Sequence, residues 1–320
     1  MTQKLITHPI LVLVGPTAIG KTALSLALAD RHNCEIISVD SMQVYRLLDV
    51  GTAKASAEER AAVVHHLIDV VDPDEDYDAG RFAEDAFAAI NTIINKGKIP
   101  LLTGGTGLYL RAVLEGISTE IVGDIKIRNS LKKRLENEGS SKLHEELYLC
   151  DQFSARRIHI NDTQRLLRAL EVFYVTGVPW SQHLESHRNR PRPIYFQNVL
   201  KLGLTSPREK LYERINRRCD EMLENGLEAE VKMLLAMGYS RELKCFGAIG
   251  YRHMLNYLSG EWTEEEMSRL LARDTRRYAK RQYTWFSKII DLHWFEVSEE
   301  ERILSTVEQW LLQQHLIEQK

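Results

Sequence analysis

The sequence predicts an α/β fold: a parallel sheet of the P-loop NTPase type flanked by helices, with a helical insertion domain and a mostly helical C-terminal part. Three observations predict it. Short apolar runs alternate with helical patterns over about the first 120 residues. A complete phosphate-loop pattern stands between the first predicted strand and the first predicted helix. From residue 124 onward the pattern becomes helical and basic.

The phosphate loop follows the apolar run Ile10–Val14, which is typical of a buried parallel strand, and precedes a helix predicted over Ala23–Arg31. The loop fills every fixed position of G-x-x-x-x-G-K-[ST], with Gly15, Pro16, Thr17, Ala18, Ile19, Gly20, Lys21 and Thr22. Its glycines let the backbone fold around an anion, and the helix N-terminus directs free N–H groups at that anion. Lys21 adds a positive charge, and the Thr22 hydroxyl can hold Mg²⁺. We therefore expect a di- or triphosphate site; a glycine-rich turn with an unrelated lysine fits these flanks less well.

Further strands are predicted over Cys34–Val39, His66–Val70 and Ile99–Thr103, with a helix over Arg81–Asn95. Asp40 follows the first of these strands, Asp69 lies in the second, and Gly104–Thr106 follows the third. Because the carboxyl ends of parallel strands meet at one edge of a sheet, we expect Asp40, Gly104–Thr106 and the phosphate loop to lie together. An acid at that edge holds Mg²⁺ or accepts a proton in phosphate-loop kinases, so a small-molecule kinase is one function that these residues allow.

Residues 124–193 form the predicted insertion domain, between a core at 1–123 and a return to the core with C-terminal helices at 194–320. Two short helices are predicted over Ile125–Asn137 and Lys142–Leu149. A longer helix is capped by Asp162 and ends near Thr176, where Gly177 and Pro179 stop it. The run Arg188–Pro193 is predicted to be a stiff, basic linker.

The insertion is the basic part of a chain whose net charge is −3. Residues 1–123 carry 10 Lys or Arg against 16 Asp or Glu, residues 124–193 carry 13 against 9, and residues 194–320 carry 19 against 20. A basic segment in an acidic protein indicates a polyanionic partner. A helical segment with a solvated basic face fits the charge count equally well.

The last region is predicted to be mostly helical after a returning strand over Val199–Leu204. Ser206-Pro207 is expected to cap the next helix, and Thr263 with Glu266 to form a capping box for a helix reaching about Ile290. This long helix carries a basic stripe of Arg269, Arg273, Arg277 and Lys280, and its aromatic residues Tyr278, Tyr283, Trp285 and Phe286 are interpreted as core. His293–Val297 is predicted to be an edge strand.

Composition limits the function classes. The chain is 44% hydrophobic and 27% charged, as in globular domains, and its length suggests two domains. No apolar run reaches the roughly 18 residues that span a bilayer, and the N-terminus is too short and polar for a signal peptide. The four cysteines, Cys34, Cys150, Cys219 and Cys245, lie far apart without C-x-x-C spacing. We therefore expect no membrane segment, no zinc and no disulfide framework, and a cytoplasmic location.

Several segments together are more specific than the phosphate loop alone. In the first half these are Gly15–Thr22, Asp40-Ser41-Met42-Gln43-Val44-Tyr45-Arg46, Gly51-Thr52-Ala53-Lys54, His65-His66-Leu67-Ile68-Asp69 and Gly104-Gly105-Thr106-Gly107-Leu108-Tyr109. In the second half they are Asn161-Asp162, Gln164-Arg165, Arg168-Ala169-Leu170-Glu171-Val172, Ile249-Gly250-Tyr251-Arg252, Ala279-Lys280-Arg281-Gln282 and Thr284-Trp285-Phe286. With these segments the chain resembles, over nearly its whole length, the tRNA dimethylallyltransferases (tRNA isopentenyltransferases, the IPP transferase family).

The resemblance implies transfer of the dimethylallyl group from dimethylallyl diphosphate to N6 of adenosine 37, beside the anticodon of tRNAs that read codons beginning with U. The products would be N6-(dimethylallyl)adenosine and diphosphate. The phosphate loop would then hold a diphosphate leaving group with Mg²⁺ on Thr22, Asp40 would be the general base, and Thr106 would hold the reacting amine. From the residues alone, Asp40 could equally be an N-cap or an Mg²⁺ ligand, and Thr106 an N-cap.

The resemblance also implies where the RNA binds. The residues that match family contacts to tRNA are Asp40, Ser41, Met42, Gln43 and Thr106 in the core, and Arg128, Gln164, Arg165, Leu166, Leu167 and Arg168 in the insertion, which would grip the anticodon stem-loop. Arg214 and Arg218 match arginines that the family places near the diphosphate, although surface ion pairs with Glu213 or Glu221 would also explain them. The loop Lys244–Tyr251 departs from the family pattern by mixing two variants, and the zinc module of some eukaryotic relatives is missing.

Three alternatives stay open at this point. One is a small-molecule kinase that binds ATP in the phosphate loop, and another is an RNA-binding module with a regulatory phosphate loop. The third is an isopentenyltransferase acting on free adenine nucleotides, for which a basic insertion of this size would have little use. With the family resemblance we expect a monomer that binds tRNA and dimethylallyl diphosphate and uses Mg²⁺.

Overall fold

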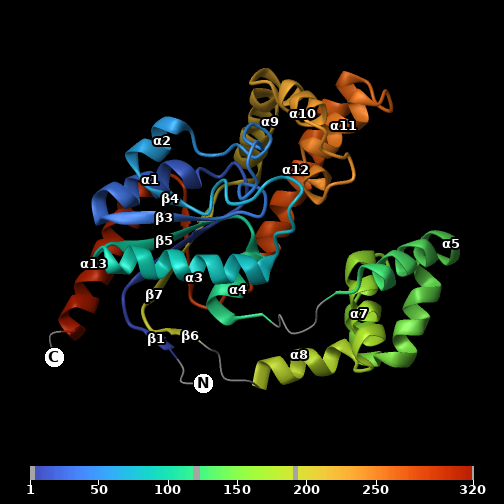
Figure 1. Cartoon of the computed structure of the whole chain (residues 1–320). Helices are drawn as coiled ribbons and strands as arrows, with labels where there is room; N and C mark the ends of the chain where they lie inside the picture. The colour runs from blue at the N-terminus through green and yellow to red at the C-terminus, as the bar shows by residue number, and fades with distance from the viewer. Residues whose placement is uncertain (1–3, 118–122, 190–193, 319–320) are drawn as a thin grey trace. The chain divides into compact units, whose positions relative to one another are not determined.

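A computed structural model describes residues 4–117, 123–189 and 194–318 (Figure 1). The chain divides into two compact units, which are described separately. The larger unit contains residues 4–115 and 194–318, and the smaller one contains residues 116–117 and 123–189. No described helix is both long and apolar enough to cross a bilayer.

The larger unit is built on a six-stranded sheet with the order β4-β3-β5-β2-β7-β8, in which every neighbouring pair is parallel. Its strands are β2 (Ile10–Val14), β3 (Cys34–Val39), β4 (His65–His66), β5 (Ile99–Gly104), β7 (Val199–Thr205) and β8 (Leu292–Glu296). All residues of β2 and β3 are buried, including the polar Glu35 and Ser38 of β3, and the uninterrupted apolar run of β2 predicts its burial. A separate parallel pair joins β1 (Lys4–Ile6) to β6 (Ile194–Phe196). The predicted fold class, a parallel sheet flanked by helices, is thus confirmed.

Helices cover both faces of this sheet. The helices α1 (Lys21–His32) and α3 (Ala79–Asn95) lie on opposite faces (Figure 1), and α13 (Glu300–Glu318) packs on α1. The remaining helices of the first region are α2 (Ala57–Ala62) and α4 (Gly107–Glu115). An apolar core lies between the sheet, α1 and α13, and includes Leu13, Leu28, Leu202 and Ile303, all fully buried.

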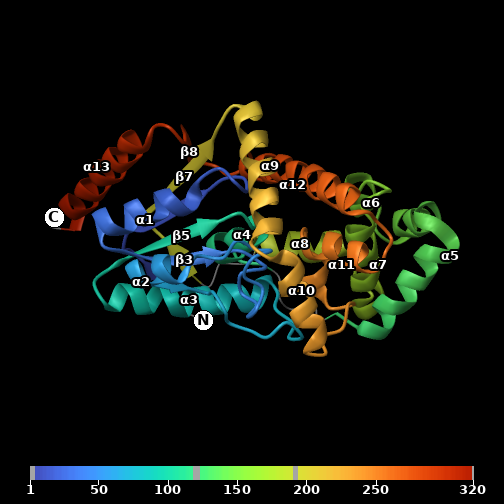
Figure 2. The same cartoon turned by 90° about the horizontal axis from the view of Figure 1, so that it is seen from above.

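A helical layer lies beyond the carboxyl ends of β3 and β5 (Figure 2). It consists of α9 (Arg208–Glu224), α10 (Leu227–Ala236), the short 3-10 helix η1 (Lys244–Gly247), α11 (Tyr251–Leu258) and α12 (Glu264–Phe286). At the start of α12 the Thr263 hydroxyl accepts a hydrogen bond from Glu266 N at 3.2 Å, which is one of the two bonds of the predicted capping box. The helix ends at Phe286, four residues before the predicted end. Pro207 occupies the N-cap position of α9.

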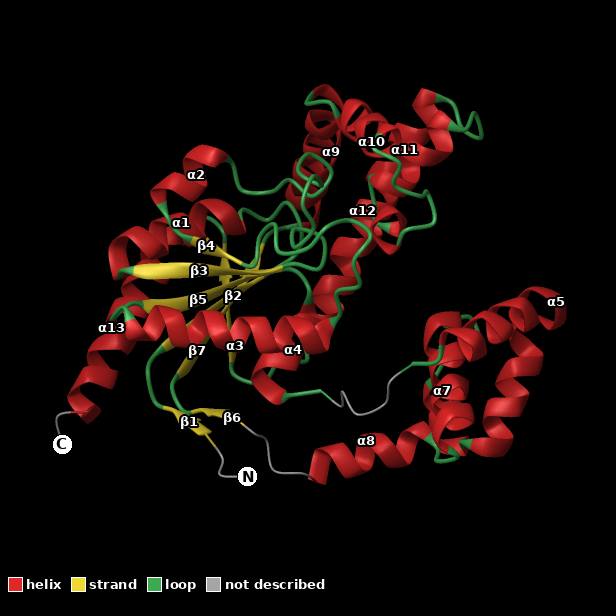
Figure 3. Ribbon diagram, in the orientation of Figure 1, coloured by secondary structure: helices red, strands yellow, loops and turns green. Residues whose placement is uncertain are grey.

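The smaller unit consists of α5 (Ile125–Cys150), α6 (Gln152–Arg157), α7 (Thr163–Thr176) and α8 (Trp180–Asn189), drawn in red in Figure 3. Gly139, with φ 81°, interrupts α5 and separates the two helices predicted there. The Asp162 side chain caps α7 and Gly177 ends it with φ 70°, as predicted. The sequence reading missed α6 and α8; Arg188 and Asn189 belong to α8, and the rest of the predicted linker lies outside the described residues.

The predicted strand His66–Val70 is wrong beyond its first residue. Only His65 and His66 pair with β3, in β4. Leu67 and Asp69 have positive φ angles of 62° and 57°, which turn the chain away from the sheet. The apolar run therefore belongs mostly to a connecting loop.

Candidate active site

A cavity of about 690 Å³ lies in the larger unit and is lined by groups that follow several strands of the sheet. The phosphate loop contributes Thr17 to Thr22, and the segment after β3 contributes Asp40 and Gln43. Gly104 and Gly105 come from the end of β5, Arg214 and Arg218 from α9, and Tyr278 and Gln282 from α12. The structure thus brings together the phosphate loop, Asp40 and the glycines after β5, as expected for the carboxyl edge of a parallel sheet.

The phosphate loop joins β2 to α1 and contains two residues in the left-handed region, Ala18 with φ 62° and Gly20 with φ 107°. Lys21 Nζ donates hydrogen bonds to the carbonyls of Gly15 and Pro16, both at 2.9 Å. Burial, assisted by the positive charge of Arg218, lowers the pKa of Lys21 to about 7, and Asp40 opposes this shift. An anion in the loop would therefore favour the charged form of this lysine.

Two arginines of α9 face the same loop. Arg214 Nη1 donates to the carbonyl of Ile19 at 3.0 Å, and Arg218 Nη2 donates to the carbonyl of Thr52 at 3.4 Å. Burial lowers the pKa of Arg218, while the negative charge of Asp40 raises it. These contacts with backbone carbonyls hold both guanidinium groups at the cavity, which is where an anion would need them.

Asp40 begins a tight turn after β3. Its Oδ1 atom accepts hydrogen bonds from Met42 N at 2.8 Å and Gln43 N at 3.3 Å. The Gln43 side chain accepts from Ser38 Oγ at 2.8 Å and donates to the carbonyl of Thr52 at 3.4 Å. Asp40 thus caps a turn and not a helix, which differs from the helix N-cap considered from the sequence, and its carboxylate lines the cavity.

The carbonyl of Thr106 accepts from Tyr109 N and Leu110 N of α4, but its side chain is joined to the Asp40 turn. Its hydroxyl oxygen accepts a hydrogen bond from Ser41 N at 3.1 Å and lies 3.5 Å from Ser41 Oγ, while Thr106 N donates to the carbonyl of Val39 at 3.1 Å. The side chain therefore links the end of β5 to the Asp40 turn. These bonds of the hydroxyl differ from those of an N-cap of α4, which was the simpler expectation.

Gln282 is a site residue to which the sequence reading gave no role. Its Oε1 atom accepts from Thr17 N at 2.9 Å, and its Nε2 atom donates to the carbonyl of Gly105 at 3.0 Å. The side chain is only 5% exposed. A Cβ atom on Gly105 would lie 2.2 Å from Nε2, so a side chain at that position would displace the Gln282 amide. Gln282 thus ties the phosphate loop to the segment that carries Thr106.

Tyr278, one turn earlier on α12, also lines the cavity. Burial and the charge of Asp40 raise the pKa of its hydroxyl, and interactions with Thr106 and Gln282 oppose the rise. The interpretation of the α12 aromatics as core holds for Phe286, which is 1% exposed, but is wrong for Tyr278. The spacing of four residues between Tyr278 and Gln282 puts both on one face of the helix, and this was the available signal.

The smaller unit holds the other predicted contact residues. Arg128 forms a two-pronged ion pair with Glu171 at 3.1 and 3.2 Å, and Arg168 binds the same carboxylate at 2.9 Å. The Glu171 side chain is 2% exposed, so two partly exposed arginines share one buried acid. Arg165 pairs with Asp162 at 2.9 Å and is 61% exposed.

Leu166 requires a correction among these residues. It is 0% exposed and belongs to the apolar core of the smaller unit, against which Leu167 also packs. The Leu166 side chain therefore presents no surface to RNA, because α7 turns it inward. Gln164 is exposed. Among the polar residues predicted to contact RNA in this unit, Gln164, Arg165, Arg168 and Arg128 all have side chains at its surface.

Comparison with known proteins agrees with this arrangement. The family model for IPP transferases matches residues 43–289, and the model for isopentenyl transferases matches residues 8–73. The chain belongs to the IPP transferase family. It is 53% identical to the tRNA dimethylallyltransferase of Desulfotalea psychrophila over 306 residues, which are 96% of each chain. It is 43% identical to that of Acetivibrio thermocellus, over 94% of this chain and 97% of the relative.

Solved structures place the chain in the same family. The full-length tRNA isopentenylpyrophosphate transferase of Bacillus halodurans matches over 100% of both chains with 40% identity and a TM-score of 0.70. A eukaryotic dimethylallyltransferase acting on tRNA matches 91% of this chain and 74% of its own, with 31% identity and a TM-score of 0.74. The family resemblance identified from the motifs is therefore confirmed.

The cavity of this IPP transferase offers oxygen donors suited to Mg²⁺. The Thr22 hydroxyl and the Asp40 carboxylate both line it, and Mg²⁺ typically takes one or two protein oxygens together with phosphate oxygens and water. In the described part of the chain, no three His, Cys, Asp or Glu side chains gather as a metal site. The donor set thus fits a metal that enters with a diphosphate.

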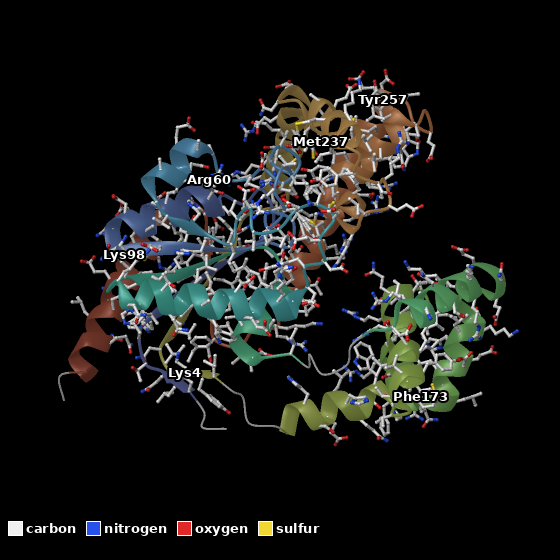
Figure 4. The ribbon with its side chains drawn as sticks, viewed as in Figure 1. Lys4, Arg60, Lys98, Phe173, Met237 and Tyr257 are labelled. Carbon is white, nitrogen blue, oxygen red and sulfur yellow. The ribbon has the colours of Figure 1, made fainter. Side chains whose placement is uncertain are left out.

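Asp69, the second acid considered from the sequence, is engaged elsewhere. Its carboxylate binds Lys54 Nζ at 2.7 Å and Arg60 Nη1 at 2.8 Å; Arg60 is labelled in Figure 4. The Lys54 side chain is nearly fully buried and also pairs with Asp49. Because two cations neutralise Asp69, it stabilises the loop after β4, and Asp40 is the acid at the cavity.

Proposed function

We propose that this IPP transferase moves the dimethylallyl group of dimethylallyl diphosphate to N6 of adenosine 37, beside the anticodon of tRNAs that read codons beginning with U. One observation carries the proposal: a single cavity combines a cationic phosphate loop with the Asp40 carboxylate. The first feature suits a diphosphate leaving group, and the second suits an amine that must lose a proton. Two relatives are named tRNA dimethylallyltransferase, and the eukaryotic structural neighbour acts on tRNA.

The leaving group would be stabilised by the phosphate loop. As the bond between C1 of the prenyl group and the diphosphate oxygen breaks, negative charge grows on that oxygen. Backbone N–H groups of the loop, Lys21, Arg214 and Arg218 supply positive charge where it grows. Mg²⁺ held by the Thr22 hydroxyl, with Asp40 close by, would supply further electrophilic stabilisation.

The acceptor amine would be activated on the opposite side of the reacting carbon. The N6 lone pair is delocalised into adenine, so the amine is a weak nucleophile until it loses a proton. Asp40 accepts that proton as the new N6–C1 bond forms, and Thr106 holds the amine in position. Hydrogen bonds from Met42 N and Gln43 N keep Asp40 Oδ1 in place during this step.

We further propose that tRNA is bound by exposed side chains of the smaller unit and by the Asp40 turn. Arg128, Arg165 and Arg168 can contact backbone phosphate, and Gln164 lies beside the N-terminus of α7. In the turn, Ser41, Met42 and Gln43 would contact the RNA around the adenosine that leaves its stack. We expect the enzyme to act as a monomer in the cytoplasm; light scattering with and without tRNA tests the first expectation.

The decisive test is mass spectrometry of tRNA nucleosides after incubation with dimethylallyl diphosphate and Mg²⁺. The proposal requires a gain of the dimethylallyl group on adenosine. Two parallel reactions, one with radiolabelled ATP and one with free adenine nucleotides as acceptors, examine the kinase and the free-nucleotide alternatives. Phosphate transfer, or prenylation of free nucleotides without modification of tRNA, would contradict the proposal.

A further inference from the structure

Glu230 is a buried acid on α10, outside the cavity, that gathers hydrogen bonds from one short loop. Its Oε2 atom accepts from the backbone N–H groups of Asp49 at 2.8 Å and Val50 at 2.7 Å. Its Oε1 atom accepts from Gly51 N at 3.1 Å and from the Tyr251 hydroxyl at 2.5 Å. The residue is only 8% exposed. Four donors from two segments thus converge on one carboxylate.

Tyr251 fixes the other side of the same loop. A Cβ atom on Gly51 would lie 2.5 Å from two carbons of the Tyr251 ring, so only glycine allows this approach. Burial and the neighbouring Glu230 charge raise the pKa of the Tyr251 hydroxyl, which keeps it a neutral donor. The loop is therefore bound by Glu230 along its N–H groups and supported by the tyrosine ring. Figure 4 labels Tyr257, on the same helix as Tyr251, and Met237, just after α10.

The held loop forms part of the cavity wall, with Thr52 and Ala53 lining it. The carbonyl of Thr52 accepts from Arg218 Nη2 and from Gln43 Nε2, each at 3.4 Å, and the carbonyl of Ala53 accepts from Gln43 Nε2 at 3.4 Å. Thr52 and Ala53 directly follow Gly51, the last residue whose N–H group Glu230 binds. The position of the Arg218 guanidinium therefore depends on a loop that Glu230 and Tyr251 hold.

We infer that Glu230 is a positioning residue for the diphosphate site, acting through residues 49–53 on Arg218. This inference rests on the proposed function, because Arg218 has a role only if a diphosphate occupies the phosphate loop. A carboxylate suits the task because it accepts several N–H donors at once, which an amide of the same shape cannot do. Loss of these bonds frees the Thr52 carbonyl and lets the Arg218 side chain leave the anion.

The test measures binding of inorganic diphosphate with Mg²⁺ by calorimetry, alongside kcat and KM for the prenyl diphosphate. Glu230→Gln places an NH₂ group against N–H donors, and we expect roughly tenfold weaker diphosphate binding, the usual size of an effect from a supporting hydrogen-bond partner. Glu228→Gln is the matched control, since Glu228 is on the same helix and forms a surface ion pair with Lys232; it should behave as wild type. Affinity for tRNA should stay within about twofold of wild type in both variants.

Arg218→Ala distinguishes positioning from general damage. If Glu230 acts through Arg218, Glu230→Gln should change diphosphate affinity less than about twofold in the Arg218→Ala background. Tyr251→Phe removes one donor without a change of ring volume, and its smaller loss should also vanish in that background, even if Glu230→Gln folds poorly. Equal losses with and without Arg218 would overturn the inference. A wild-type protein that does not bind diphosphate would contradict the proposed function and this inference with it.

Discussion

Hydrogen bonds distinguish side chains that can react with substrate from side chains that support the site. The examples are Asp40, Gln282 and Lys21. Asp40 has one oxygen engaged by two backbone N–H groups, and so its carboxylate is oriented before substrate arrives. Gln282 accepts from Thr17 N and donates to the Gly105 carbonyl, which gives it a supporting role. Lys21 is held by two carbonyls that an anion would replace with stronger, charge-assisted bonds. Each pattern predicts a different result on substitution.

Asp40→Asn should remove the general base and keep the turn. The asparagine oxygen can still accept from Met42 N and Gln43 N, so tRNA affinity should stay within a few-fold of wild type. Turnover should fall by about 10² to 10⁴, the usual contribution of a general base. Single-turnover prenylation of a tRNA, followed by nucleoside analysis, measures this. Turnover close to that of wild type would remove Asp40 from the mechanism.

The variants Gln282→Glu and Gln282→Leu should show what each of the two Gln282 hydrogen bonds contributes to KM and kcat. The glutamate keeps an acceptor for Thr17 N but faces the Gly105 carbonyl with a second oxygen, so the Thr106 segment should shift while the phosphate loop stays. We expect KM for the prenyl diphosphate within a few-fold of wild type and kcat lowered roughly ten- to hundredfold. Leucine breaks both bonds and should raise KM as well. Identical kinetic constants for the two variants would rule out this division of roles.

Lys21 should take up a proton when diphosphate binds at pH 8. Its pKa is lowered from 10.5 to about 7 by burial, so the free enzyme holds mostly the neutral amine at pH 8, and a bound anion restores the charged form. Calorimetric titration in two buffers of different ionisation enthalpy measures the uptake, and Lys21→Met is the control that should abolish it. Buffer-independent binding heats would show that Lys21 is already charged.

The same shift makes stability depend on pH. Between about pH 7 and pH 10.5 the unfolded chain binds more protons at Lys21 than the folded chain does. The Lys21 contribution to the free energy of unfolding therefore rises with pH across this window. It is constant below the window, where both states are protonated. Diphosphate binding should flatten this dependence, because it returns the folded pKa toward its ordinary value.

At the scale of elements, α7 shows how one helix serves a core and a surface. Leu166 and Leu170 point into the apolar core of the smaller unit. Arg165 and Arg168, on the same helix, point toward solvent. The Asp162 cap fixes where the helix begins, and the 3.6-residue period then decides which side chains can meet a ligand. Contacts predicted for consecutive residues of such a helix are therefore split between its two faces.

Leu166→Ala should destabilise the smaller unit, and Arg165→Ala should not. Removing a fully buried leucine side chain costs about 2–5 kcal/mol, whereas removing an exposed arginine changes stability by about 0.5 kcal/mol or less. Hydrogen exchange of the α7 backbone amides reports this unit separately from the larger one. Equal protection in the two variants would mean that Leu166 does not carry core packing.

At the scale of the whole molecule, charge is divided between the units. Residues 1–123 have a net excess of acids, residues 124–193 have a net excess of bases, and the cationic groups of the larger unit include Lys21, Arg214 and Arg218 in the cavity. Such a division allows one part to bind a small anion and the other to bind the backbone of an RNA. The two binding functions should then respond to different substitutions.

Arg165→Ala combined with Arg168→Ala should weaken tRNA binding and its salt dependence, and leave diphosphate binding unchanged. Each lost phosphate contact lowers the slope of log affinity against log salt by about 0.7–0.9, so the pair should lower it by roughly one to two. Glu171 keeps Arg128 as a partner, so no buried acid is left unpaired. Arg302→Ala combined with Lys232→Ala, which removes two exposed positive charges from the larger unit, is the charge-matched control. Unchanged slopes would assign the smaller unit a purely structural role.

The sequence by itself determined the features that depend on neighbouring residues. The strands β2, β3 and β5, the phosphate loop, the Asp162 cap and the break at Gly139 follow from short apolar runs and from the backbone preferences of single residues. Motif recognition extended this to the family and to Asp40, because the family segments are local as well.

Only the tertiary structure decided the features that join distant segments. Gln282 reaches Thr17 across 265 residues, and Glu230 reaches Val50 across 180, and no local pattern marks either side chain as a partner of its target. The same holds for Asp69, which two cations withdraw from the cavity, and for Leu166, whose inward direction depends on what α7 packs against. A hydrogen bond or a buried contact requires two groups to meet in space, and chain folding alone brings these pairs together.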